Sequence, residues 1–162
     1  MNVEKTSYPI RKTYGLWQNT FKLLREIKAE MGKLMEMTGS FRVLIVEDSA
    51  LFRKLLREML YDRFPSVEIY EAKDGEETLL QAEALRPHLI FMDIRLPGEN
   101  GLQLTQKIKA RYPKIIVIIL TGYDLPEYRE ASSQYADYFF SKDSSTRESI
   151  FRLVESIFPN RL

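Results

Sequence analysis

Residues 91 to 101 read FMDIRLPGENG. An apolar run that begins at Leu89 leads directly into Asp93, and a proline and two glycines follow within eight residues. A run of continuously apolar residues is typical of a parallel strand that is covered on both faces. Proline and glycine after it indicate a turn. The stretch therefore predicts a buried strand that ends on a bare carboxylate.

Similar apolar runs recur from residue 41 onward, and amphipathic segments of helix length separate them. We predict strands at 41–46, 67–72, 88–93, 114–120 and 137–141, and helices at 49–61, 75–85, 102–112, 126–134 and 145–158. Five such units predict an α/β fold with a doubly wound five-stranded parallel sheet in the order 2-1-3-4-5. The residues expected on the buried side of the first helix are Leu51, Phe52, Leu55, Leu56 and Met59.

Three acidic residues fall at predicted strand ends. Glu47 and Asp48 follow the first strand and Asp93 ends the third, so this topology brings all three to the crevice at the carboxyl ends of the strands. Because crowded like charges repel, a cation is expected among them. Oxygen donors without histidine or cysteine suit Mg²⁺ (or Mn²⁺), and a metal that holds phosphate makes Asp93 a candidate nucleophile.

Two further polar groups end the neighbouring strands. Thr121 ends the fourth strand with a glycine after it, and Lys142 follows the fifth. A hydroxyl can donate to a phosphoryl oxygen, and an ammonium can pair first with Asp93 and then with phosphate. A threonine and glycine after a strand are more often merely a turn, so each signal is weak by itself. Their conjunction with the acidic residues predicts a site for phosphoryl transfer.

Residues 41 to 160 resemble the receiver domain of two-component response regulators, a CheY-like and flavodoxin-like fold. The resemblance rests on the stretches VLIVEDSALFRKLL (43–56), MDIRLPGENGLQL (92–104), ILTGY (119–123) and DYFFSKDSS (137–145). It implies that Asp93 is the phosphoacceptor, with Thr121 and Lys142 in catalytic positions and Phe139 as a switch residue beside Thr121. It also implies metal contacts from Glu47, Asp48, Asp93 and the backbone carbonyl of Arg95.

The resemblance implies a signalling phosphoprotein rather than an enzyme with a separate substrate. It would accept a phosphoryl group from a histidine kinase or phosphotransfer protein, catalyse only its own phosphorylation and dephosphorylation, and act through contact with a downstream protein. The alternative is a dimerisation or scaffold module whose receiver fold is not used as a phosphorylation switch. A phosphohydrolase is disfavoured, because Arg95 stands where such enzymes usually carry a second aspartate. We expect no effector domain after the last helix.

Three features depart from the usual receiver pattern. Asp143 follows Lys142, where many receivers have proline. Tyr135 occupies a turn position where glycine is common, and a positive φ there would strain it. Arg95 and Tyr123 are both bulky and should flank the approach of a hydrolytic water to Asp93.

The N-terminal segment differs in character from the rest of the chain. Residues 1–39 hold seven Lys/Arg and four Asp/Glu, whereas residues 40–162 hold seventeen and nineteen. Apolar residues at helical spacing predict an amphipathic helix from about residue 16 to residue 36, namely Trp17, Leu24, Ile27, Met31 and Leu34. We therefore divide the chain into an extension at 1–39 and a receiver domain at 40–160. Three readings stay open for the extension: a homodimer through its helix, docking onto its own receiver, or a true start at Met37.

Composition narrows the remaining classes. The sequence has no cysteine, which removes disulfides and thiolate metal sites. It has neither an apolar stretch of about 20 residues nor the apolar core of a signal peptide, so we expect a cytoplasmic protein that does not span a membrane. A net charge of +1 favours no polyanion, and no direct DNA binding is expected.

Overall fold

The computed structural model of the chain describes residues 22–23, 25–27, 30 and 39–158. Backbone contacts divide the chain into one unit at residues 1–39 and another at residues 40–162. In the first unit, the described residues from 22 to 30 are helical, and Lys22 and Glu26 form an ion pair at 3.9 Å. The rest of the predicted amphipathic helix, including Trp17 and Leu24, lies outside the described residues.

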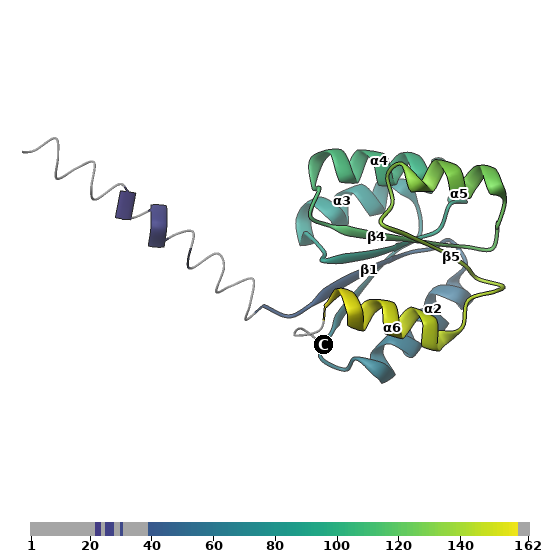
Figure 1. Cartoon of the computed structure of the whole chain (residues 1–162), viewed down its shortest axis with the longest axis horizontal. Helices are drawn as coiled ribbons and strands as arrows, with labels where there is room; N and C mark the ends of the chain where they lie inside the picture. The colour runs from purple at the N-terminus through teal and green to yellow at the C-terminus, as the bar shows by residue number, and fades with distance from the viewer. Residues whose placement is uncertain (1–21, 24, 28–29, 31–38, 159–162) are drawn as a thin grey trace, which may run out of the picture. The chain divides into compact units, whose positions relative to one another are not determined.

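The second unit consists of five strand–helix pairs (Figure 1). The strands are β1 (Arg42–Val46), β2 (Glu68–Ala72), β3 (Leu89–Met92), β4 (Ile116–Thr121) and β5 (Tyr138–Ser141). The helices are α2 (Ala50–Arg63), α3 (Gly75–Leu85), α4 (Gly101–Arg111), α5 (Pro126–Ser133) and α6 (Arg147–Ile157). Each lies where the sequence pattern predicts it, within two residues at either end. Within the described ranges, no helix has the length and apolar character needed to cross a membrane.

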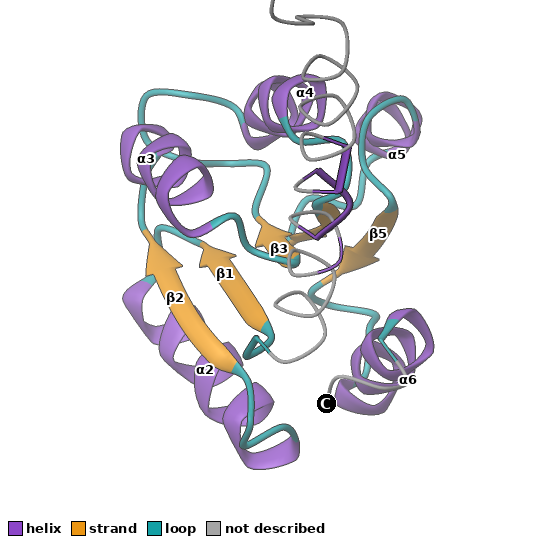
Figure 2. Cartoon of the chain, turned by 90° about the vertical axis from the view of Figure 1, so that its left-hand side faces the viewer, coloured by secondary structure: helices purple, strands orange, loops and turns teal. Residues whose placement is uncertain are grey.

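The five strands form one parallel sheet in the order β2-β1-β3-β4-β5, as predicted. Helices α3, α4 and α5 cover one face of the sheet, and α2 and α6 cover the other (Figure 2). In a sheet of this order the direction of winding reverses between β1 and β3. The carboxyl ends of those two strands therefore border the crevice in which such folds bind ligands.

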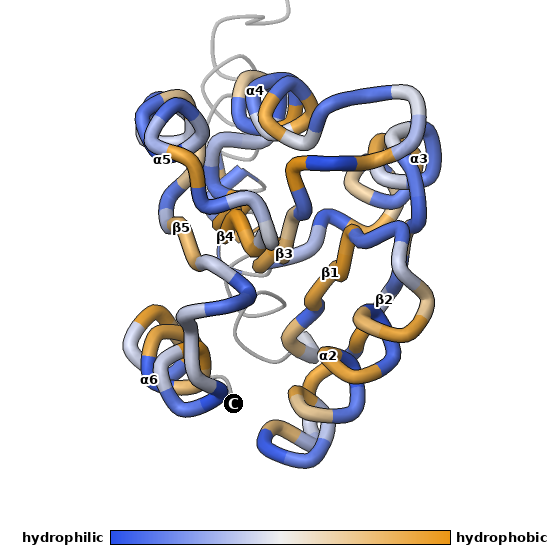
Figure 3. Tube along the Cα trace, turned by 90° about the vertical axis from the view of Figure 1, so that its right-hand side faces the viewer, coloured by the Kyte–Doolittle hydropathy of each residue, from blue (hydrophilic) through white to orange (hydrophobic). Residues whose placement is uncertain are grey.

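Two apolar clusters form the core, one on each face of the sheet. Successive residues of a strand point to opposite faces, so Ile45 and Phe91 pack towards α2 and α6, while Val46 and Met92 pack towards α3 and α4. The strands at the centre of this unit are drawn largely in orange, the colour of hydrophobic residues (Figure 3). All four residues of β3 are buried, which confirms the two-sided covering predicted from its apolar run.

The prediction for the buried side of α2 was wrong in part. Leu51 and Leu55 are 69% and 50% exposed, whereas Leu56 and Leu60 are buried. Neighbouring residues on a helix are rotated by about 100° from one another, so a small rotation of the helix exchanges which leucine faces the sheet. Helix α2 therefore buries a narrower stripe than predicted and leaves two leucines on the surface.

The turn before β5 has no strained residue at position 135. Helix α5 ends at Ser133, and Gln134 follows in right-handed helical conformation, with φ −80° and ψ −27°. Among the described residues only Arg86 and Gly98 have positive φ. Tyr135 therefore needs no left-handed conformation, and the helix ends without the glycine that is common at this turn.

Candidate functional site

The three acidic residues predicted to meet do lie together at the ends of β1 and β3. The amide of Glu47 donates to the carbonyl of Ala72 at 3.0 Å, and that of Asp93 donates to the carbonyl of Val46 at 2.9 Å. These bonds carry the sheet pairing one residue past each strand end. One carboxylate oxygen from each of Glu47, Asp48 and Asp93 lies within 4.8 Å of the other two.

Lys142, directly after β5, reaches two of these carboxylates. Its Nζ lies 2.7 Å from Oδ2 of Asp93 and also donates to Oε2 of Glu47. The two acidic residues are 5% and 3% exposed. Their remaining oxygens accept from backbone amides, those of Ile94 at 2.6 Å and Ser49 at 3.1 Å. Every carboxylate oxygen of this buried pair thus has a donor, as buried charges require.

The buried setting changes the proton affinity of both partners. Burial raises the pKa of Glu47; the hydrogen bond from Lys142 opposes the rise, and the charge of Asp93 adds to it. Burial alone lowers the pKa of Lys142, but its hydrogen bonds to Asp93 and Glu47 outweigh that effect and leave the pKa above the ordinary value of 10.5. Lys142 is therefore a permanent cation at neutral pH, set between two carboxylates.

Asp48 differs from its two neighbours because it is exposed. Its carboxylate makes no hydrogen bond or ion pair within the part of the chain that the structure describes. The candidate ligand atoms of the three acidic residues are all carboxylate oxygens, and that of Asp48 is exposed. Lys142 offsets only one of the three negative charges. These features fit a hard divalent cation such as Mg²⁺, which prefers oxygen ligands and keeps several waters.

Thr121 lies beside this group on the neighbouring strand. It is the last residue of β4, fully buried, and pairs in register with Ser141 of β5. Its Oγ1 accepts a hydrogen bond from the amide of Tyr123 at 3.3 Å, and its carbonyl accepts from the amide of Lys142 at 2.8 Å. The described contacts use the hydroxyl only as an acceptor, so its proton is available for another group.

Phe139 on β5 is half-buried and is held from the surface side by an arginine. The guanidinium carbon of Arg129 lies 4.6 Å from the ring centroid of Phe139. Arg129 in turn donates from Nη2 to Oδ2 of Asp124 at 2.6 Å. Asp124 stands three residues after Thr121, so this contact chain joins the loop after β4 to the predicted switch aromatic. The sequence pattern gave no sign of it.

The loop between β3 and α4 is shaped by two glycines. Gly98 has a φ of 80°, a backbone conformation that residues with a side chain rarely adopt. A Cβ atom at Gly101 would lie 1.9 Å from the carbonyl oxygen of Asp93, so only glycine fits there. Arg95 of this loop pairs with Asn100 in an antiparallel bridge. The loop that carries the predicted metal-binding carbonyl of Arg95 is thus folded tightly against the end of β3.

Arg95 and Tyr123, the two bulky residues beside Asp93 and Thr121, contact each other. The guanidinium carbon of Arg95 lies 3.7 Å from the ring centroid of Tyr123, which is 39% exposed. Such close stacking of a guanidinium on an aromatic ring is favourable by about 0.5–1 kcal/mol at an exposed site. The stack bridges the loops that follow β3 and β4.

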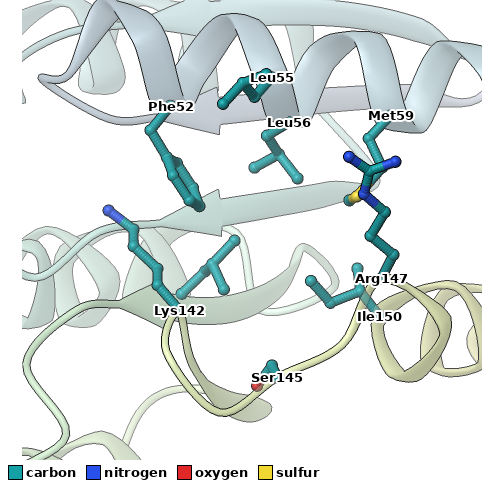
Figure 4. A pocket seen from close by; sticks show the side chains of 9 residues that line it. Phe52, Leu55, Leu56, Met59, Lys142, Ser145, Arg147 and Ile150 are labelled. Carbon is teal, nitrogen blue, oxygen red and sulfur yellow. The ribbon is translucent and has the colours of Figure 1, made fainter.

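Phe52, predicted on the buried side of α2, packs partly against the core and also covers the side of Lys142. The ammonium lies 4.2 Å from the Phe52 ring centroid. Figure 4 shows the two side chains at one end of a hollow of about 200 Å³ between α2 and α6, whose other walls are mostly apolar, with Arg147 at the far end. A partly buried cation gains from an aromatic face, so Phe52 helps to hold Lys142 in the site.

The chain belongs to the family of response regulator receiver domains, whose model matches residues 43–154. These are receivers of two-component systems, and phosphorylation and magnesium binding are general features of the family. Among solved structures, a CheY-like receiver domain protein from Methanospirillum hungatei aligns with a TM-score of 0.67 at 25% identity, over 74% of this chain and 94% of that one. The receiver of the putative regulator NarL from Mycobacterium tuberculosis gives 0.65 at 29% identity, over 75% and 98%.

Curated relatives include two kinds of longer protein. The response regulator GacA of Pseudomonas protegens is 39% identical over 80 residues, which is 49% of this chain and 38% of GacA. A protein named protein-glutamate methylesterase/protein-glutamine glutaminase 2, from Carboxydothermus hydrogenoformans, is 44% identical over 123 residues, which is 74% of this chain and 34% of that protein. The chain thus spans little more than a third of each relative, and the likeness concerns the receiver.

Proposed function

We propose that Asp93 accepts a phosphoryl group from a histidine kinase or a phosphotransfer protein, and that the chain signals by a change of conformation and contact with a downstream protein. One observation carries the proposal: the buried carboxylate of Asp93 accepts a hydrogen bond from Lys142 at 2.7 Å, and one of its oxygens lies within 4.8 Å of carboxylate oxygens of Glu47 and Asp48. Phosphoryl transfer depends mainly on positioning and charge stabilisation, which this arrangement supplies.

In the proposed step an oxygen of Asp93 attacks the phosphorus atom of a phosphohistidine. The new O–P bond forms as the P–N bond breaks, and the bonding electron pair stays on the imidazole nitrogen of the donor. Mg²⁺ (or Mn²⁺), held by Glu47, Asp48, Asp93 and the carbonyl of Arg95, would withdraw charge from the phosphoryl oxygens. Lys142 pairs with the phosphoryl group once it is on Asp93.

The phosphoryl group then acts on the residues beside it. Thr121 turns its unused hydroxyl proton to a phosphoryl oxygen, and Phe139 takes the space that this movement leaves. Because Arg129 contacts both Phe139 and Asp124, its ion pair must adjust in the same step. We propose further that the protein is cytoplasmic and that its output is contact with another protein and not with DNA. It would catalyse only its own phosphorylation and dephosphorylation.

Intact-mass measurement tests this proposal. Purified protein is incubated with Mg²⁺ and a small-molecule phosphodonor, and the mass gain of one phosphoryl group is expected for the wild type and lost in Asp93→Asn. Asp143→Asn, which changes an exposed aspartate next to Lys142, is the matched control and should keep the gain. A gain that persists in Asp93→Asn contradicts the assignment. A wild type that is never phosphorylated favours the scaffold alternative.

A further inference from the structure

Arg53, in the first turn of α2, binds the backbone of the loop that carries Glu47 and Asp48. Its Nη1 lies 2.6 Å from the carbonyl oxygen of Glu47 and 3.4 Å from that of Asp48. Side chains of a helix lean towards its N-terminus, so an arginine at this position extends back over the residues that precede α2. The side chain is only 17% exposed, which strengthens these charge-assisted contacts.

The opposite edge of the same guanidinium is fixed on the sheet. Nε of Arg53 lies 3.0 Å from Oε2 of Glu71, which stands on β2 beside Ile45 of β1. The other oxygen of Glu71 is 2.9 Å from Nε of Arg57, one turn further along α2. Arg53 therefore links the loop after β1 to a carboxylate on the neighbouring strand, and its orientation is determined at both ends.

This link matters because no hydrogen bond or ion pair in the described part of the chain holds the Asp48 side chain. Glu47 is fixed through its carboxylate by Lys142 and Ser49, whereas the direction of the Asp48 carboxylate depends on its backbone alone. Arg53 contacts the carbonyls on both sides of the Asp48 residue. A loop that carries two neighbouring negative charges would otherwise relax so that they move apart.

We propose that Arg53 is a positioning residue for the metal site, which fixes the peptide between Glu47 and Asp48 so that both carboxylates face Asp93. The inference rests on the proposed function in one respect, because it takes the acidic cluster to hold a divalent cation. Groups that orient metal ligands without touching the metal typically change metal affinity about 10- to 100-fold when they are removed.

Arg57 provides a matched control because it shares the partner but not the loop. Both arginines pair with Glu71, and only Arg53 reaches the carbonyls of Glu47 and Asp48. If Arg53 served only to pair with Glu71, losing either arginine would have a similar effect. If Arg53 positions the loop, the two variants should differ in metal affinity.

The experiment measures the Kd for Mg²⁺ by calorimetry in the wild type, Arg53→Met and Arg57→Met. The Kd should rise roughly tenfold or more in Arg53→Met and stay near the wild-type value in Arg57→Met. Arg53→Lys should recover part of the affinity, since its ammonium can reach one carbonyl. In the metal-free protein, hydrogen exchange should accelerate at the amide of Ser49, which donates to Glu47, in Arg53→Met but not in Arg57→Met.

The outcomes separate this inference from the proposed function. A wild type that binds no Mg²⁺ overturns the metal site itself, and the inference with it. A wild type that binds Mg²⁺ while Arg53→Met binds equally well overturns the positioning role alone, as does an equal loss in Arg57→Met. Circular dichroism establishes that each variant is folded. If Arg53→Met does not fold, Arg53→Lys and Arg57→Lys give the same comparison, and equal affinities for that pair overturn the inference.

Discussion

Lys142 balances the charge of the site, and this single residue makes two buried carboxylates tolerable. Without it, Glu47 and Asp93 would be like charges in a poorly solvated place, which costs several kcal/mol per ion. The raised pKa of Lys142 has a defined sign: its contribution to stability is complete below 10.5, the ordinary value, and is lost only as the pH rises through the higher folded-state pKa.

The raised pKa of Glu47 predicts that protons compete with Mg²⁺. Because burial favours the neutral acid, Glu47 takes up its proton at a higher pH than an ordinary glutamate with a pKa of 4.5. The apparent Kd for Mg²⁺ should therefore increase as the pH falls from neutral towards that range, which calorimetric titrations at a series of pH values can measure. In the metal-free protein, the pH affects folding stability in the opposite direction to its effect on Mg²⁺ binding. A carboxyl group with a raised pKa makes the folded state less stable as the pH rises through this window.

Glu47→Gln is the control for this pH dependence. The variant keeps the size of the side chain and removes its titration, so it should bind Mg²⁺ more weakly at neutral pH and lose most of the wild-type pH dependence. If Glu47→Gln keeps the wild-type pH dependence, another group is responsible for the competition.

The loops after β3 and β4 meet through the stacked Arg95 and Tyr123 at the edge of the site. Loss of the phosphoryl group needs a water in line with the bond between Asp93 and phosphorus. We expect the stack to close part of that approach, because both residues follow the strand ends that carry Asp93 and Thr121, and neither side chain carries a carboxylate or an amide that would orient the water.

We predict that opening this stack shortens the lifetime of the phosphorylated protein. A contact worth about 0.5–1 kcal/mol corresponds to a roughly two- to fivefold change in rate, so Arg95→Asn with Tyr123→Glu should lose phosphate at least that much faster. The loss can be followed by intact mass after the phosphodonor is removed.

A second arginine–tyrosine stack offers the matched control. The guanidinium carbon of Arg86 lies 3.8 Å from the ring centroid of Tyr112, next to a different loop. Arg86→Asn removes that stack, and asparagine tolerates the left-handed conformation found at this position. This variant should dephosphorylate at the wild-type rate. An unchanged or slower rate in the Arg95 and Tyr123 double variant would refute the shielding role.

The N-terminal extension bears on the oligomeric state of the protein. The described part of the extension is helical, and Ile27, one of the predicted apolar residues, is 45% exposed. An amphipathic helix of about 20 residues leaves an apolar stripe that a second copy could bury. We therefore propose that the extension at residues 1–39 dimerises the chain, while the domain at residues 40–160 carries the phosphorylation site.

Deletion of residues 1–36 should then convert a dimer into a folded monomer, which light scattering can measure as a halved molar mass. Leu24→Asp with Met31→Asp should have the same effect in the full-length chain, because both changes place a charge on the predicted apolar stripe. Lys22→Ala, at an exposed position on the opposite side of the helix, should leave the dimer intact. Equal molar masses for the full-length and shortened chains would eliminate this role and leave the other two readings of the extension.

The strand order and the meeting of the carboxylates could be predicted from the sequence for a simple physical reason. Parallel strands that alternate with helices place all their carboxyl ends at one edge of the sheet. Residues that directly follow the apolar runs, such as Glu47 and Asp93, must therefore become neighbours whatever the details of packing. The glycines at 98 and 101 were predicted only as part of a turn after the strand. The structure supplies the reason for each, a φ of 80° at Gly98 and, at Gly101, no room for a Cβ atom beside the carbonyl oxygen of Asp93.

Which long side chains meet across elements could not be predicted from the sequence, because it depends on how the elements pack. Three side-chain pairs each join two segments of the chain: Arg53 with Glu71, Arg95 with Tyr123, and Arg129 with Phe139. No residue spacing along the sequence predicts these contacts. The same holds for α2, where the rotation of the helix on the sheet buried Leu60 and exposed Leu55. Arginine has many rotamers and a long reach, so its partner is set by distances that exist only after the helices have packed on the sheet.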